Sequence, residues 1–158
     1  RVNLSYLDLK QPIFELSGGE MRKVALCGVL ALEPKVLILD EPTVALDYQS
    51  REEIMAMVKR LKEEFDMTIV LVTHNMDYVL EYADKVFVLK NGEISFEGKV
   101  EDLFLNEQVL KENSLELPEV LKFYKKLEAN NIVLDVFPKK YEELINALKN
   151  KIGSSRNE

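Results

Sequence analysis

The sequence predicts an α/β fold, in which a partial parallel sheet with flanking helices precedes a small, mainly helical appendage. Two short apolar runs, residues 36–40 and 68–73, have the length and composition of buried strands. Apolar residues at helical spacing follow each run, at residues 50–65 and 76–83. This alternation is typical of parallel sheets, and the continuous apolar character of the first run indicates a central strand that is covered on both faces.

A helix is expected to begin at residue 18, ahead of the first strand, and to end near residue 32. Ser17 is the expected N-cap, and Glu20, three residues later, completes the pattern of a capping box. From Val24 onward the segment is apolar nearly all round, which indicates a buried helix.

The second half of the chain begins with a hairpin. The dipeptide Asn91-Gly92 separates two strand-like runs and is a strong hairpin signal. We expect the first domain to cover residues 1–105, a polar linker to cover residues 106–117 and a small helical extension to cover residues 118–152, before a disordered tail at residues 153–158. The apolar positions of the extension have helical spacing: Val120, Leu121, Tyr124, Leu127, Tyr141, Leu144, Ile145, Leu148 and Ile152.

Composition narrows the classes of function. The 158 residues carry a net charge of −7, which argues against a general nucleic-acid surface, and no nucleic-acid partner is expected. One cysteine, Cys27, and one histidine cannot build a Cys/His metal cluster. The longest uncharged apolar run, residues 24–32, is far short of the roughly 20 residues that span a bilayer. Because the chain starts at Arg1 and not at Met, we expect a fragment, a processed product or a trimmed chain.

Asp40 and Glu41 stand side by side at the end of the first predicted strand. Ligands of parallel α/β sheets collect at the carboxyl ends of strands, and Mg²⁺ binds one or two carboxylates together with waters and phosphate oxygens. One carboxylate can therefore hold a metal ion while the other polarises an attacking water. The alternative is an ordinary acidic dipeptide at a strand-to-loop junction.

His74 ends the second predicted strand and would lie beside Glu41 if the two strands are neighbours. A neutral imidazole offers one donor and one acceptor, so it could contact a phosphate or orient a water. Ser17, Gly18 and Gly19 open a helix, where free N–H groups and the helix dipole attract anions. The alternatives are a satisfied histidine at a strand end and a plain helix cap.

The order and spacing of these segments resemble the ATP-binding-cassette (ABC) ATPases, which have a P-loop NTPase-like fold. The segment LSGGE (residues 16–20) is similar to the family's signature motif, with Glu where Gln is more usual. VLILDE (36–41) resembles the Walker B strand with its catalytic glutamate, and ALD (45–47) resembles the D-loop. His74 resembles the switch histidine, and residues 84–98 resemble the hairpin that follows in transporter members.

The resemblance covers about residues 5–105 and implies a catalytic site for ATP hydrolysis, with ATP and Mg²⁺ as cofactors. It implies that Asp40 helps to hold Mg²⁺ and that Glu41 is the general base toward the hydrolytic water. It also implies that His74 senses the γ-phosphate.

In this family two nucleotide domains meet head to tail. The resemblance therefore implies that Ser17, Gly18, Gly19 and Glu20 contact the ATP of a second ATPase subunit, which is either a copy or a paralogue. Asp47 would communicate across that dimer.

Three features depart from the family pattern. The sequence contains no GxxxxGK[ST] loop for the phosphates, because none of the glycines opens one: Gly18, Gly19, Gly28, Gly92, Gly98 and Gly153. Ala45 stands where the family often has Gly, and Asn75 where it often has Asp. Neither of these two replacements is expected to abolish activity, but the missing phosphate loop is, so this chain is expected to be inactive by itself.

Residues 115–132 resemble the C-terminal extension of energy-coupling-factor ATPases, which drive uptake of vitamins, cobalt or nickel and use the extension to hold two ATPase subunits together. The resemblance implies a peripheral protein at the cytoplasmic face of the membrane, bound to transmembrane transporter subunits. Two alternatives stay open: a non-transport ABC ATPase, and a non-catalytic fragment that docks on a partner ATPase.

Overall fold

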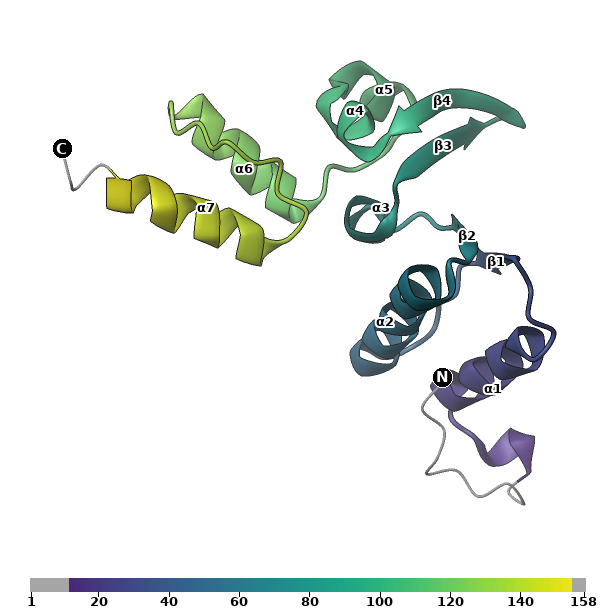
Figure 1. Ribbon diagram of the computed structural model, residues 1–158. Helices are drawn as coiled ribbons and strands as arrows, with labels where there is room; N and C mark the ends of the chain where they lie inside the picture. Colours follow the sequence, from purple (N-terminus) through teal and green to yellow (C-terminus); the bar gives the residue numbers. More distant parts are fainter. Residues whose placement is uncertain (1–11, 155–158) are drawn as a thin grey trace. The chain divides into compact units, whose positions relative to one another are not determined.

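The computed structural model describes residues 12–154 (Figure 1). The chain divides after His74 into two compact units. We call the described part of the first, residues 12–74, unit 1, and that of the second, residues 75–154, unit 2. Each unit is described by itself.

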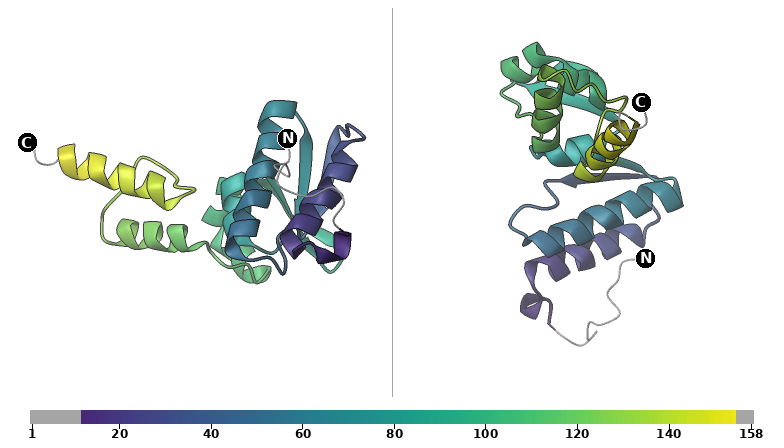
Figure 2. Two further views of the ribbon diagram at one scale, coloured as in Figure 1. Left: turned by 90° about the horizontal axis from the view of Figure 1, so that it is seen from below. Right: turned by 90° about the vertical axis from the view of Figure 1, so that its left-hand side faces the viewer.

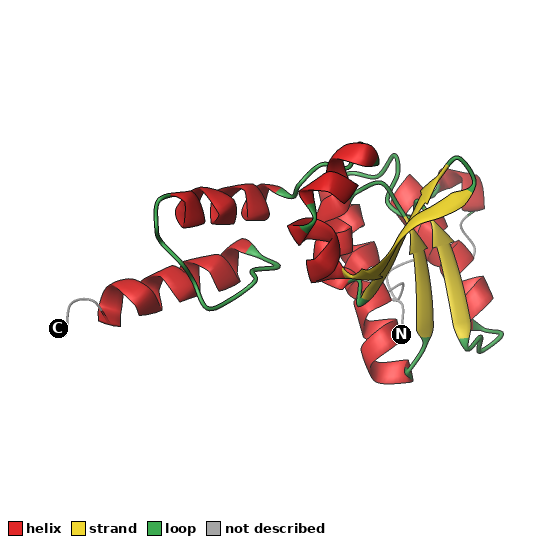
Figure 3. Cartoon of the chain, turned by 90° about the horizontal axis from the view of Figure 1, so that it is seen from above, coloured by secondary structure: helices red, strands yellow, loops and turns green. Residues whose placement is uncertain are grey.

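Unit 1 is a two-stranded parallel sheet with two helices. Its elements are the 3-10 turn η1 (Ile13–Glu15), helix α1 (Gly18–Leu30), strand β1 (Val36–Asp40), helix α2 (Tyr48–Phe65) and strand β2 (Thr68–Val72). The strands β1 and β2 pair in parallel, in a register that places Val36 opposite Thr68 and Asp40 opposite Val72 (Figure 3). The two predicted apolar runs are therefore neighbours, and their carboxyl ends lie at the same edge of the sheet.

The core of unit 1 lies between the helices and one face of the sheet. Helices α1 and α2 lie side by side (Figures 1 and 2). The buried core residues come from both helices, from β1 and from the turn before α2: Leu26, Leu37, Leu46, Ile54, Met57, Val58 and Leu61. The spacing of the apolar residues in α2 predicted this face.

The expectation that β1 is covered on both faces is wrong for this structure. Val36 and Ile38 of β1 and Val70 and Val72 of β2 are 43–67% exposed. Because side chains alternate along a strand, these residues share the face opposite to the core. Both helices pack on the same face, so an apolar run that reads as doubly buried has one face open.

Helix α1 is also shorter and less buried than expected. It ends at Leu30, two residues before the predicted limit, and Gly19, Lys23 and Leu26 are its buried residues. Val29 is 44% exposed. Only one side of α1 meets α2 and the sheet, and an apolar segment gives no indication of which side that is.

Unit 2 joins a hairpin to five helices among the residues described. Its elements are α3 (Met76–Tyr82), β3 (Lys85–Lys90), β4 (Glu93–Lys99), α4 (Val100–Leu105), α5 (Glu107–Glu112), α6 (Glu119–Ala129) and α7 (Tyr141–Ser154). Asn91 and Gly92 join β3 to β4 with positive φ angles of 53° and 82°. Positive φ at both positions is the type I′ geometry that the dipeptide predicts, so the hairpin is confirmed.

One hydrophobic cluster holds unit 2 together. It contains Leu80 of α3, Val88 of β3, Leu103 of α4, Leu110 of α5 and Leu144 of α7, together with residues of α6. The segment expected as a linker thus contains the short helix α5, and this helix contributes to the same core as the hairpin and the C-terminal helices. Helix α7 extends to Ser154, and the rest of the expected tail lies outside the described residues.

Candidate functional site

Glu41 directly follows strand β1 and has an unusual backbone. Its φ angle is 42°, in the left-handed region that side chains other than glycine seldom adopt. Its N–H donates to the carbonyl oxygen of Val72 at 2.9 Å, which continues the pairing of the two strands by one residue. The sheet therefore holds Glu41 in a strained conformation at the edge where both strands end, and such strain is concentrated at functional sites.

The carboxylate of Glu41 is held by the end of strand β2. The His74 N–H donates to Oε1 at 2.9 Å, and His74 Nδ1 lies 2.6 Å from the same oxygen. The Thr73 hydroxyl donates to Oε2 at 3.3 Å. An ionised carboxylate only accepts hydrogen bonds, so the proton of this contact resides on Nδ1. The other ring nitrogen, Nε2, remains available for a second hydrogen bond, and the His74 side chain is 83% exposed.

These contacts set the charge of Glu41. Partial burial acts to raise the pKa of its carboxyl, but the hydrogen bonds from His74 and Thr73 outweigh burial and hold the pKa below its ordinary value. Glu41 is therefore ionised at neutral pH, with a side chain that is still 30% exposed. An ionised carboxylate in partial contact with solvent can accept a hydrogen bond from a water molecule.

Two residues that the sequence did not single out also contact Glu41. Thr73 binds its side chain, and Arg22 of α1 donates from Nη1 to its backbone carbonyl oxygen at 2.9 Å. The position of Thr73 next to His74 could have indicated its role. The contact of Arg22, 19 residues earlier in the chain, depends on how α1 packs against the sheet.

The expected capping box at the start of α1 is confirmed. The Glu20 N–H donates to the Ser17 hydroxyl oxygen at 3.3 Å, and the Ser17 N–H donates to Glu20 Oε2 at 2.8 Å. The Ser17 hydroxyl also donates to that carboxylate oxygen, at 2.7 Å. In this structure the side chains of Ser17 and Glu20 therefore satisfy the hydrogen-bonding needs of backbone N–H groups at the start of the helix.

The two glycines of this segment have different surroundings. A Cβ atom built on Gly19 would lie 2.7 Å from Ser50 Oγ on α2, whereas one on Gly18 would lie 3.7 Å from the Leu46 side chain. Ser50 cannot move away without loss, because its hydroxyl donates to Asp47 at 2.7 Å. Gly19 is thus required for the close approach of the two helices.

We expect Gly19→Ala to lower the free energy of unfolding by about 1–3 kcal/mol, because the added methyl group overpacks the α1–α2 contact. Gly28→Ala is the matched control in the same helix, because a Cβ there meets no atom within 4 Å. The control should keep or slightly raise stability, since Ala is the better helix former. Urea unfolding of both variants checks this, and equal effects would contradict the packing argument.

Asp47 is the N-cap of α2. Its carboxylate accepts from the Ser50 N–H at 2.9 Å and from the Ser50 hydroxyl, and these bonds lower the pKa of Asp47 below its ordinary value. Ala45, two residues earlier, has a φ angle of 61°. Such a backbone favours glycine, which explains physically why glycine suits this position of the turn.

Asp40 lies at the exposed end of β1, beside Glu41 in sequence. Over residues 12–154, no group of three or more His, Cys, Asp or Glu side chains is arranged to hold a metal ion. A magnesium ion that also binds phosphate oxygens and water needs only one or two carboxylates from the protein. The donor set at Asp40 therefore fits a metal ion shared with a phosphate ligand and does not fit an all-protein metal site.

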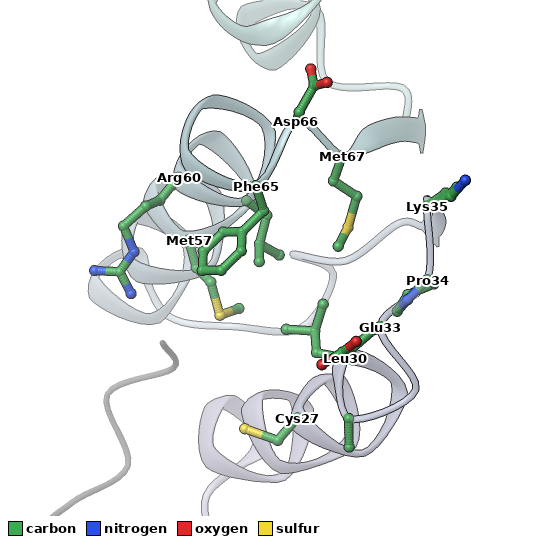
Figure 4. Close-up of a pocket in the computed structure, with 12 residues that line it drawn as sticks. Cys27, Leu30, Glu33, Pro34, Lys35, Met57, Arg60, Phe65, Asp66 and Met67 are labelled. Atoms are coloured by element: carbon green, nitrogen blue, oxygen red, sulfur yellow. The ribbon is translucent and has the colours of Figure 1, made fainter.

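A cavity of about 580 Å³ lies at the opposite end of unit 1. Cys27 and Leu30 of α1 line it, together with Met57 and Phe65 of α2 and Met67 (Figure 4). These elements surround the places where the strands begin, whereas the Glu41–His74 contact lies where the strands end. Its lining is mainly apolar, with the charged residues Glu33, Lys35, Arg60 and Asp66 among the others, and the cavity takes no part in the site described above.

Comparisons with known proteins agree with this geometry. The family model "ABC transporter" matches residues 2–44. An "Energy-coupling factor transporter ATP-binding protein EcfA2" of Enterococcus faecalis is 46% identical over 151 residues, which is 96% of this chain and 52% of the relative. The chain therefore spans about half the length of the curated relatives it matches.

Solved structures agree as well. The chain resembles cbiO1 of Clostridium perfringens, part of the ABC transporter complex cbiONQ, with a TM-score of 0.56, 39% identity and coverage of 73% of this chain and 46% of that one. It also resembles the ATP-binding cassette MJ0796 in a dimer bound to ADP and Pi, with a TM-score of 0.50, 38% identity and coverage of 55% and 37%. On these matches the chain belongs to the ATP-binding-cassette transporter ATPases, in the branch that contains the energy-coupling-factor ATP-binding proteins.

Proposed function

We propose that this chain supplies the hydrolytic part of an ATPase subunit in an energy-coupling-factor-like transporter, which couples ATP hydrolysis to solute uptake. The observation that carries the proposal is the Glu41 carboxylate held between His74 and Thr73, where two paired parallel strands end. The similarity to EcfA2 of Enterococcus faecalis supports the transporter class over a non-transport ABC ATPase.

In this proposal Glu41 is the general base. Its carboxylate is ionised, and His74 and Thr73 hold it at hydrogen-bond distance, so that the oxygen lone pairs not used in these bonds are available to a water molecule. His74 donates from Nδ1 to Glu41, and its exposed ring leaves Nε2 available for a hydrogen bond to a ligand.

Mg²⁺ would supply charge neutralisation at the phosphates, and Asp40 is the residue of this chain that would hold it. For the phosphates themselves the described residues offer no cradle, and the sequence contains no GxxxxGK[ST] loop. We therefore assign no phosphate-binding step to this chain. Ser17, Gly18, Gly19, Glu20 and Asp47 are proposed to face the nucleotide of a second ATPase subunit.

The proposed partners are a second ATPase subunit and transmembrane transporter subunits. The dimeric cassette MJ0796 supports the first, and the cbiONQ complex that contains cbiO1 supports the second. None of the described helices is long and apolar enough to cross a bilayer. We propose a peripheral position at the cytoplasmic face of the membrane, with residues 118–152 as a dimerisation element.

A second candidate function is a non-catalytic chain that docks on a partner ATPase. The open apolar face of the β1–β2 sheet favours it, because parallel strands are generally covered on both faces. In that case the chain would contribute its signature-like segment to the nucleotide site of the partner.

Nucleotide binding separates the two candidates. We expect the full-length protein to bind Mg-ATP and hydrolyse it, and the 158-residue chain by itself to show no micromolar affinity in a fluorescent-nucleotide titration. Micromolar binding by the isolated chain would overturn the view that its phosphate cradle is missing. A full-length protein that binds no ATP would overturn the ATPase proposal in favour of the docking function.

A further inference from the structure

Three hydrogen bonds hold the backbone of Glu41. Its N–H donates to Val72 in β2, and its carbonyl oxygen accepts from the Val44 N–H at 3.2 Å. The same carbonyl oxygen accepts from Arg22 Nη1 at 2.9 Å. The first two bonds are backbone pairings that most residue types would allow, whereas the third depends on one particular side chain.

Arg22 is well placed to hold this carbonyl. It is half-buried on α1, on the turn after the capping box formed by Ser17 and Glu20. Its guanidinium is always charged and rigid, so a hydrogen bond from it is stronger and better directed than one from a neutral side chain. The next residue, Lys23, forms an ion pair with Glu53 of α2, which fixes the start of α1 against α2.

The conformation of Glu41 needs such support. A φ angle of 42° at a non-glycine residue persists only where the surroundings enforce it. If the backbone of Glu41 relaxed to negative φ, the direction of its Cα–Cβ bond would change, and the carboxylate would leave the Oε1 contact with His74. The bond from Arg22 acts on the backbone atom that would have to rotate.

We propose that Arg22 is a positioning residue for the general base: its bond to the Glu41 carbonyl fixes the left-handed backbone that keeps the carboxylate on His74. The proposal rests on the proposed function of Glu41. The same hydrogen bond connects the start of α1, which contains the signature-like segment, to the residue that carries the hydrolytic carboxylate. A shift of α1 would thus be transmitted to Glu41 through one hydrogen bond.

The test is steady-state ATP hydrolysis by the full-length protein with Arg22→Met, which keeps an unbranched apolar stem and removes every donor. We expect kcat to fall roughly 10- to 100-fold, since small displacements of a catalytic group have effects of this size, while KM stays within about twofold. Arg22→Lys, which can still donate one bond, should recover part of the activity. Arg60→Met on the exposed side of α2 is the control for loss of an arginine and should keep the wild-type rate.

A double-mutant cycle distinguishes positioning from a general loss of structure. If Arg22 acts through Glu41, then Arg22→Met should cause no further loss of hydrolysis in a protein that already carries Glu41→Gln. The same fold-loss in both backgrounds would overturn the positioning role, as would full activity of Arg22→Met with Glu41→Gln inactive. Full activity of Glu41→Gln alone would instead overturn the proposed function, so the two failures are distinguishable.

Discussion

Replacing Glu41 by Gln is expected to reduce ATP hydrolysis by the full-length protein by about two to four orders of magnitude, the usual contribution of a general base. The amide keeps the size of the side chain, its single oxygen can still accept from His74, and its NH2 group can donate to the Thr73 hydroxyl oxygen, but it cannot take a proton from water. Nucleotide affinity should stay nearly unchanged, because no described contact of Glu41 belongs to a phosphate cradle. Single-turnover hydrolysis and nucleotide binding measured on the same preparation check both statements.

The matched control is Glu52→Gln, the same chemical change at an exposed position of α2. It should keep the wild-type rate. Unchanged turnover in Glu41→Gln would show that Glu41 is not the base. A loss of nucleotide binding that accompanies the loss of turnover would instead indicate a structural defect.

Replacing Leu103 by Ala should lower the free energy of unfolding by about 2–5 kcal/mol, the range for truncation of a fully buried leucine. Leu103 is 1% exposed and belongs to the cluster that joins the hairpin to the helices of unit 2. The loss combines the transfer of the missing methyl groups with the cavity that they leave behind. Urea denaturation followed by circular dichroism measures it.

Leu105 of the same helix α4 is 61% exposed and provides the control. Leu105→Ala makes the same chemical change without opening a cavity, so we expect it to alter the free energy of unfolding by only about 0.5 kcal/mol. Similar losses for the two variants would mean that the single core of unit 2 does not determine its stability.

Several local features followed from sequence because they depend on residues close together in the chain. The capping box of Ser17 and Glu20 needs a spacing of three residues, and the hairpin needs Asn91 and Gly92 at its turn. The parallel pairing of the strands agreed with the order of strands and helices. That pairing brought Glu41 and His74 into contact, as expected for adjacent carboxyl ends.

The main difference between the sequence-based expectation and the structure is in which residues are buried. An apolar run such as residues 36–40 indicates that a strand can be buried, but each face must be covered by some other part of a structure. Ile38 is 67% exposed while its neighbour Leu37 is 4% exposed, although the two have nearly the same hydrophobicity. Which face is covered depends on how helices α1 and α2 pack, and the residues of the strand alone do not determine that packing.

The sequence by itself determined the local elements and the residue types of the site: the caps, the turn, the two carboxylates and the single histidine. Only the tertiary structure decided the left-handed backbone of Glu41, the hydroxyl of Thr73 on its carboxylate and the bond from Arg22 to its carbonyl. The physical reason is distance along the chain. Propensity and periodicity act over a few residues, whereas these contacts join residues 19 and 32 positions apart and form only when α1 and β2 pack around the end of β1.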